Sequence, residues 1–182
     1  MKKTISLFIF FIVSISVNAT ELMKAIDAGN TSEVKLALTN GSDFNEKLDE
    51  YGGFENMTPV VWAIKKKNPE ILKVLLEAGA SVDSTGGSFD VPAISMVVAT
   101  SSISTPMMLE MIDILIMHSV DINARSQDNA GVLHSAAYTA RNEVIQKLIE
   151  NGANKNIKND DGQTPFELAK IFGKDEVQLL LK

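Results

Sequence analysis

The apolar residues between positions 58 and 83 follow a spacing typical of two short helices. Residues 60–64 are all apolar, and a second run places Ile71, Leu72, Leu75 and Leu76 on one helical face. A weaker copy of the pattern starts at position 91, clearer copies start at 131 and 164, and 22–45 carries a partial copy. A repeat period of this kind predicts stacked units that bury their apolar faces against one another.

Local signals predict where the helices of a unit begin and end. The Thr58 hydroxyl suits a cap for the first helix, and Pro59 suits the first helical position because its missing N–H has no helical partner there. Asn68 and Pro69 repeat this signal for the second helix, and Gly79 supplies the left-handed residue that ends it. Each unit is therefore predicted to be a pair of antiparallel helices.

Two motifs recur in register along the chain: a Thr-Pro start followed by alanine, seen at 164–169, and a Gly-Ala loop, seen at 151–156. Both resemble the ankyrin repeat. The unit that starts at Val91 keeps only part of the pattern, and only one unit, at 126–158, keeps the motif histidine, His134. The resemblance implies an all-α ankyrin-repeat solenoid of about five helix-turn-helix units with short β-turn fingers. We place the units at about residues 20–50, 54–85, 86–125, 126–158 and 159–182.

The third unit is predicted to be longer than the others. Gly79 and Ser119 lie 40 positions apart, whereas Ser119 and Gly152 lie 33 apart, so this unit holds additional residues. Thr105 and Pro106 form a helix start that comes earlier than the period predicts. We therefore expect a second helix almost one turn longer and a larger loop before it, on the side opposite the fingers.

The segment 1–19 has the organisation of a secretory signal peptide. Lys2 and Lys3 precede an apolar run over 5–17, and Ala19 ends a small-x-small cleavage site. The alternative, a membrane anchor, needs ~20 apolar residues, which this run does not reach. We expect cleavage after Ala19, an exported domain over 20–182, and no membrane insertion after cleavage. The brief signal and the Lys-, Asn- and Ile-rich composition favour a small exported bacterial protein, in the periplasm or secreted.

Charge and composition narrow the function classes. The net charge of −6 becomes −8 once Lys2 and Lys3 leave with the signal peptide. Such an acidic domain is poorly suited to nucleic acid, because phosphate neutralisation supplies most of that affinity. The chain has no cysteine, which excludes disulfides and a thiolate zinc site. Its two histidines, His118 and His134, lie in different units, so we expect neither a metal nor another cofactor.

The sequence also argues against catalysis. The ankyrin resemblance assigns His134 a structural role, since the motif histidine hydrogen-bonds between units. Ser135 and Asp128 could be imagined to complete a triad with it, but neighbouring residues on a helix point in different directions. No nucleophile-elbow or oxyanion pattern is present, so an enzyme remains only a remote alternative.

Candidate binding residues are those on the fingers and the concave side that the motif does not direct inward. The first connection, 46–57, is longer than the period predicts, and it carries aromatic side chains that either contact a partner or pack the finger against the stack. Lysines end the first helix of the second unit, and loop 100–106 is an alternative site. The candidates are Tyr51, Phe54, Met57, Lys65, Lys66, Asp90, Asp128, Tyr138 and Asp160.

These features predict a non-catalytic, monomeric protein-binding module that acts after export. Its partner is expected to be another protein, bound by the concave face and fingers, with the module serving as a periplasmic inhibitor, immunity or enzyme-stabilising partner. A secreted effector that binds host proteins is the alternative. Fold alone does not decide between these roles.

Overall fold

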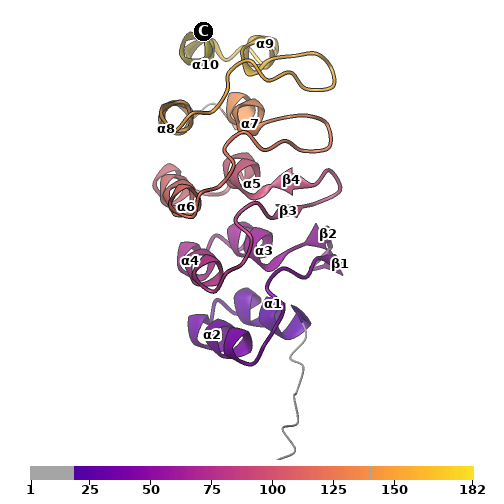
Figure 1. The fold of residues 1–182 in the computed structure, drawn as a ribbon. Helices are drawn as coiled ribbons and strands as arrows, with labels where there is room; N and C mark the ends of the chain where they lie inside the picture. Colours follow the sequence, from indigo (N-terminus) through magenta and orange to yellow (C-terminus); the bar gives the residue numbers. More distant parts are fainter. Residues whose placement is uncertain (1–18, 140) are drawn as a thin grey trace, which may run out of the picture.

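The computed structural model describes residues 19–139 and 141–182, so the predicted signal peptide lies outside the described residues except for Ala19. Within them the chain is mostly helical, and its helices stack as five antiparallel pairs (Figure 1). The pairs are α1 (Ala19–Asp27) with α2 (Thr31–Thr39), α3 (Pro59–Lys65) with α4 (Pro69–Glu77), α5 (Ala93–Ala99) with α6 (Thr105–Met117), α7 (Val132–Thr139) with α8 (Asn142–Glu150), and α9 (Pro165–Ile171) with α10 (Asp175–Leu181).

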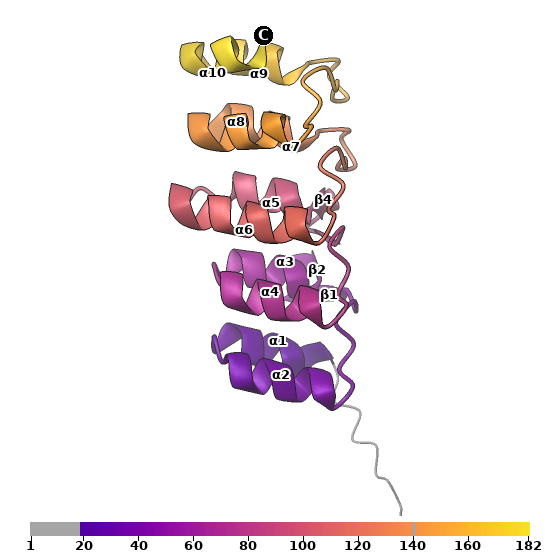
Figure 2. The same ribbon diagram turned by 60° about the vertical axis from the view of Figure 1, so that its left-hand side comes forward.

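The helices form two rows. The first helices of the pairs, α1, α3, α5, α7 and α9, contact one another in sequence and form the inner row, beside the connections between units. The second helices form the outer row, as the turned view in Figure 2 also shows. We call the connections between units the fingers; they project from the stack on the side of the inner row (Figure 1).

The first two fingers are β-hairpins, more regular than the short β-turns that the sequence led us to expect. Strand β1 (Leu48–Tyr51) pairs antiparallel with β2 (Phe54–Met57), and Tyr51 lies opposite Phe54. Strands β3 (Thr85–Gly86) and β4 (Val91–Pro92) form the second hairpin. The tight turn of the first hairpin uses Gly52 and Gly53, both with positive φ, a region that glycine enters without steric cost.

The predicted helix signals are confirmed where the structure tests them. The Thr58 hydroxyl accepts a hydrogen bond from the Val61 N–H at 3.3 Å, and the Asn68 side chain accepts one from the Ile71 N–H at 2.9 Å. Behind these caps lies a continuous core that runs through all five pairs. Small side chains let the inner helices approach closely, and those at the equivalent position of four units are all buried: Ala25, Ala63, Ala136 and Ala169.

The insertion in the third unit lies as predicted. Helix α6 has 13 residues, whereas α4 and α8 have nine each. The loop before α6 is tied to the next unit by Arg141, whose guanidinium donates to the Ser101 carbonyl at 2.8 Å and to the Ile103 carbonyl at 2.5 Å. Ile103 itself is buried. The additional residues are therefore a packed part of the stack.

Candidate binding surface

Three aromatic side chains cluster where the first finger meets the inner row. The Tyr51 ring meets Trp62 edge-on, with centroids 5.2 Å apart and an interplanar angle of 88°. Phe54 lies on the opposite strand of the hairpin, and its centroid is 5.9 Å from that of Trp62. Gly52 passes so close to the indole that an added Cβ would lie 2.5 Å from a ring carbon. The hairpin therefore folds back onto Trp62, which is itself 4% exposed.

Asp27, the last residue of α1, joins this cluster to the first unit. Its carboxylate accepts hydrogen bonds from the Trp62 indole N–H and the Tyr51 hydroxyl, each at 2.9 Å, and pairs with Lys66 at 2.7 Å. Burial raises the pKa of Asp27, but the hydrogen bonds from Lys66, Tyr51 and Trp62 outweigh it and hold that pKa below its ordinary value. For Tyr51, burial and the bond to Asp27 raise the pKa to about 12. Tyr51 therefore holds the first finger against the first two units.

The two candidate lysines have different surroundings. Lys66 is paired with Asp27, and its Nζ lies 5.0 Å from the Trp62 ring centroid. Lys65 is half-buried, and its Nζ lies 4.0 Å from the centroid of the Phe54 ring. Both lysines line an open hollow of about 260 Å³, which we call the first hollow; its other lining residues are Phe54, Trp62 and Thr100.

A second hollow, of about 360 Å³, lies between the later fingers and the inner row. The candidates Asp128 and Tyr138 both line it. The Tyr138 ring meets the Phe172 ring edge-on, with centroids 5.2 Å apart. Tyr138 is 64% exposed, so it offers most of its surface to solvent. The remaining lining residues are Ala99, Ala130, His134, Ser135, Asn159 and Leu168.

The prediction that Met57 belongs to an exposed binding surface is wrong. Met57 is 0% exposed, because it ends β2 and its side chain enters the core where the finger joins α3. The sequence analysis placed it among the finger residues that do not point inward, whereas the strand pairing puts it opposite Leu48, at the base of the hairpin.

Asp90 and Asp160 hold neighbouring fingers together. The Asp90 carboxylate pairs with Lys47 of the first finger and accepts a hydrogen bond from the Gln127 amide at 2.6 Å. These contacts, the Lys47 bond first, lower the pKa of Asp90 despite some burial. Asp160 accepts from the Asn129 side chain at 2.7 Å.

The backbone connects the fingers as well. The Gly87 N–H donates to the Glu55 carbonyl at 3.2 Å, and the Asp160 N–H donates to the Asp128 carbonyl at 3.0 Å. The Gln127 N–H donates to the Phe89 carbonyl at 2.9 Å. The four fingers from the first to the last are therefore linked in series.

His134 has the structural role that the sequence predicted. Its Nδ1 accepts from the Gly131 N–H at 3.1 Å, and its Nε2 lies 3.0 Å from the Gln163 carbonyl of the next finger. Across residues 19–139 and 141–182, no group of histidine, aspartate and glutamate side chains is arranged to hold a metal ion. Over those same ranges, no helix combines the length and the apolar character needed to cross a membrane.

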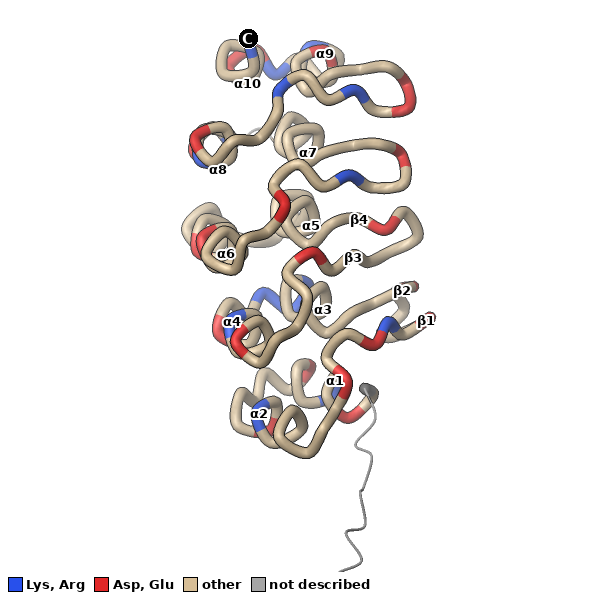
Figure 3. Tube along the Cα trace, viewed as in Figure 1, with Lys and Arg blue, Asp and Glu red and all other residues tan. Residues whose placement is uncertain are grey.

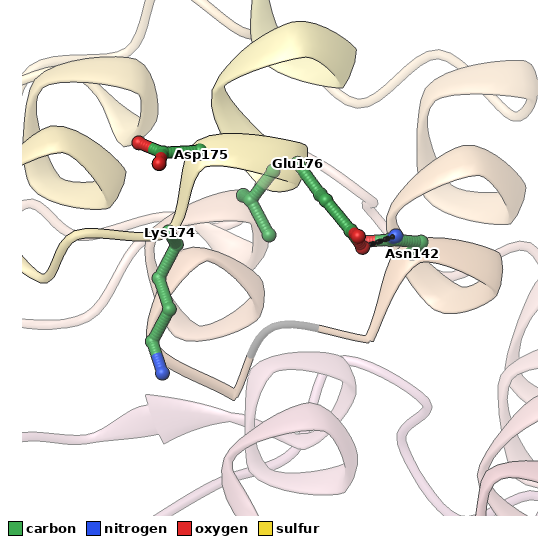
Figure 4. A pocket seen from close by; sticks show the side chains of 5 residues that line it. Asn142, Lys174, Asp175 and Glu176 are labelled. Carbon is green, nitrogen blue, oxygen red and sulfur yellow. Dashed lines mark hydrogen bonds between the residues drawn. The ribbon is translucent and has the colours of Figure 1, made fainter.

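Charge is unevenly distributed over the stack (Figure 3). Blue segments mark the lysines where α3 turns into α4, and red segments mark the acidic residues on several fingers. A further hollow, of about 170 Å³, lies between α8 and α10 (Figure 4). There the Asn142 side chain donates to Glu176 at 2.8 Å, and Lys174 and Asp175 point away from that contact. This hollow contains none of the predicted residues.

The comparisons with known families agree with this architecture. A model of three ankyrin repeats matches residues 3–86, and a model of many ankyrin repeats matches residues 115–169. Together with the stacked helix pairs and the motifs in register, these matches identify the chain as an ankyrin-repeat protein. Such repeats generally mediate protein–protein interaction and are non-catalytic modules.

Several curated proteins are similar over much of this chain. The B-cell lymphoma 3 protein homolog of Mus musculus is 26% identical over 121 residues, 66% of this chain and 26% of that protein. The mitochondrial disaggregase of Bos taurus is 28% identical over 166 residues, 88% of this chain and 22% of that protein. SH3 and multiple ankyrin repeat domains protein 2 of Homo sapiens is 25% identical over 193 residues, 90% of this chain and 10% of that protein. This chain therefore spans about a quarter or less of these relatives.

Sequence reasoning missed some residues of the surface. Trp62 belongs to the apolar run 60–64 and was not among the candidates, yet it also lines the first hollow. No sequence pattern marked Asp27 as a site residue, because it ends α1 and lies outside the first finger, which it holds through Tyr51. Phe172 follows the last inner helix, and only the stacking of α7 on α9 brings it to Tyr138.

Proposed function

We propose that the protein is an exported, non-catalytic binding module whose partner protein lies across the inner helices and the fingers. The observation that supports this is the pair of open hollows between these elements, each with an exposed aromatic side chain. Phe54 is 46% exposed at the first hollow and Tyr138 is 64% exposed at the second. Aromatic side chains at the centre of an interface typically dominate its energy.

The proposed place of action is the periplasm, where the module inhibits, neutralises or stabilises another exported protein. Secretion as an effector that binds host proteins is the second candidate, and the same surface would serve it. The predicted signal peptide supports export in both cases. Fractionation of the native cells separates the two roles, because a periplasmic partner stays with the cells and an effector reaches the medium or the host.

The export step has its own test. Mass spectrometry of the protein from its native host should give Thr20 as the N-terminal residue. Recovery of a soluble cytoplasmic form that keeps Met1 would contradict export, without bearing on the binding surface.

The binding surface is tested by capture of partner protein from periplasmic extract. We expect Phe54→Ala with Tyr138→Ala to abolish capture, because each truncation of a central aromatic costs ~2 kcal/mol or more of binding free energy. The matched control is Leu36→Ala with Met117→Ala, which removes similarly exposed apolar side chains from the outer row. Equal capture by both double variants would reject the inner surface as the binding site.

A further inference from the structure

Among the described residues, the Lys65 amine at the first hollow has no carboxylate partner. Its neighbour Lys66, by contrast, is paired with Asp27 at 2.7 Å. The contact that Lys65 does make is with the face of Phe54, at 4.0 Å from Nζ to the ring centroid.

This arrangement favours an anion at the Lys65 amine. The side chain is half-buried, and burial lowers the pKa of Lys65 because the charged form loses hydration. The attraction to the Phe54 ring offsets part of that cost. A carboxylate placed on Nζ would favour the charged form, and a charge-assisted hydrogen bond of this kind is stronger than a neutral one.

The walls of the hollow favour an apolar group beside the anion. Phe54, which is 46% exposed, supplies most of the open ring surface, because Trp62 lines the hollow but is only 4% exposed. The Thr100 hydroxyl already donates to the Met96 carbonyl at 2.8 Å. A volume of about 260 Å³ is sufficient for side chains rather than for a folded element. The lysines at this end of α3 make the hollow locally positive in a chain whose net charge is −6, which favours an acidic ligand.

We propose that the first hollow recognises an acidic segment of the partner protein. A carboxylate side chain of that segment is held at the Lys65 Nζ, and an adjacent apolar side chain packs on Phe54, next to Trp62. This inference rests on the proposed function, since it names the chemistry of the partner at one part of the same surface.

The protein contains its own reporter for the test. Trp62 is the one tryptophan of the chain and lies in the hollow, so its indole fluorescence and its indole N–H resonance report occupancy. The probes are short Gly/Ser-flanked peptides with Glu-Leu, Gln-Leu or Lys-Leu at the centre and no aromatic residue. We expect a saturable change of the Trp62 signal with the Glu-Leu peptide, and binding about tenfold weaker with the other two.

Variants at Lys65 test the assigned contact. Lys65→Met should reduce affinity for the Glu-Leu peptide about tenfold, and Lys65→Glu should invert the preference towards the Lys-Leu peptide. The matched controls are Lys67→Met and Lys67→Glu, because Lys67 is exposed, lies close by in the chain but outside the hollow, and carries the same charge. Both controls should keep the original order of affinities.

Three results would overturn the inference. They are equal binding of the Glu-Leu and Gln-Leu peptides, equal effects of the Lys65 and Lys67 variants, and competition by free glutamate as strong as by the peptide, which would define a simple anion site. A fourth result would separate the two proposals. If partner capture survives Lys65→Glu but is lost in the Phe54→Ala, Tyr138→Ala double variant, only the recognition of an acidic segment is overturned. The proposed binding function would then stand.

Discussion

The Trp62 indole N–H donates a hydrogen bond to the Asp27 carboxylate at 2.9 Å, across the junction of the first and second units. The two residues lie 35 positions apart, one at the end of α1 and the other within α3. Tyr51 donates to the other oxygen of the same carboxylate. Asp27, a residue of the first unit, thus positions both Trp62, which lines the first hollow, and the hairpin that carries Tyr51.

Asp27→Asn tests this dependence. The amide keeps the shape of the carboxylate but removes the charge that pairs with Lys66, and its NH₂ group cannot accept the bond that Tyr51 donates. We therefore expect the free energy of unfolding to fall by about 1–3 kcal/mol. Urea unfolding followed by circular dichroism measures the change. Asp49→Asn, at an exposed aspartate of the first finger, is the matched control. Equal stability of the two variants would show that the Asp27 contacts contribute nothing.

The ionisation of Tyr51 gives a second test. The chain has two tyrosines, so Tyr138→Phe leaves Tyr51 as the only phenol that ultraviolet absorbance can titrate. We expect its pKa at about 12, since burial and the bond to Asp27 disfavour the phenolate. Adding Asp27→Asn should lower this pKa but leave it above the ordinary tyrosine value, because burial is the larger cause of the shift. A midpoint near 10 in the folded protein would contradict the placement of Tyr51.

The same shift predicts how stability depends on alkaline pH. The unfolded chain loses the Tyr51 proton near pH 10, whereas the folded chain holds it until about pH 12. Between these values the folded state binds more protons than the unfolded one, so its stability must fall as the pH rises. Below pH 10 the contribution is fully present. Tyr51→Phe should flatten this part of the stability curve, as measured by urea unfolding at a series of pH values.

Leu75→Ala tests the core. Leu75 is 0% exposed between stacked units, and removing a core leucine typically lowers the free energy of unfolding by about 2–5 kcal/mol. Leu179→Ala is the matched control, since that leucine is 71% exposed in α10. Thermal melting should separate the two variants clearly. Because neighbouring units share interfaces, the Leu75 loss should also reduce amide protection in α2 and α6.

The anchoring of the insertion is tested by Arg141→Met, which keeps much of the side-chain length and removes both hydrogen bonds to loop 100–104. Bonds that involve a charged group contribute about 1.5–3 kcal/mol, so a loss of stability in that range is expected. The Ile103 N–H, which donates to the Thr100 carbonyl at 3.1 Å, should exchange with solvent faster. Arg125→Met, at an exposed arginine of the third finger, should leave that exchange rate unchanged.

The repeat pattern was sufficient for the helices because their signals are local. Thr58, Asn68 and the spacing of the apolar residues each act within one unit, and the period then requires the units to stack. The extra turn of α6 was equally readable, since Thr105 and Pro106 mark its start. The hairpin strands of the first two fingers were not predicted, although Gly52 and Gly53 are a local signal for the turn of the first hairpin.

The candidate surface was predicted less well. Subtracting inward residues identified Phe54, Lys65 and Tyr138, which do line the two hollows. It also retained Met57, which the register of the hairpin buries, and it discarded Trp62. Whether a finger residue faces solvent or the next finger is decided by contacts between units, and no pattern within a single unit carries that information.

The bonds that run from finger to finger limit how this surface can diversify. A fingertip residue such as Asp90 serves the finger before it through Lys47 and the finger after it through Gln127. Changing that residue to suit a new ligand therefore disturbs two neighbours at once, and compensating changes must arise in both. Among the described residues, the side chains of Phe54 and Tyr138 make ring contacts and no such bond between fingers, so they are free of this constraint. Re-engineering of the module for a new target should begin at such positions and leave the linked fingertips in place.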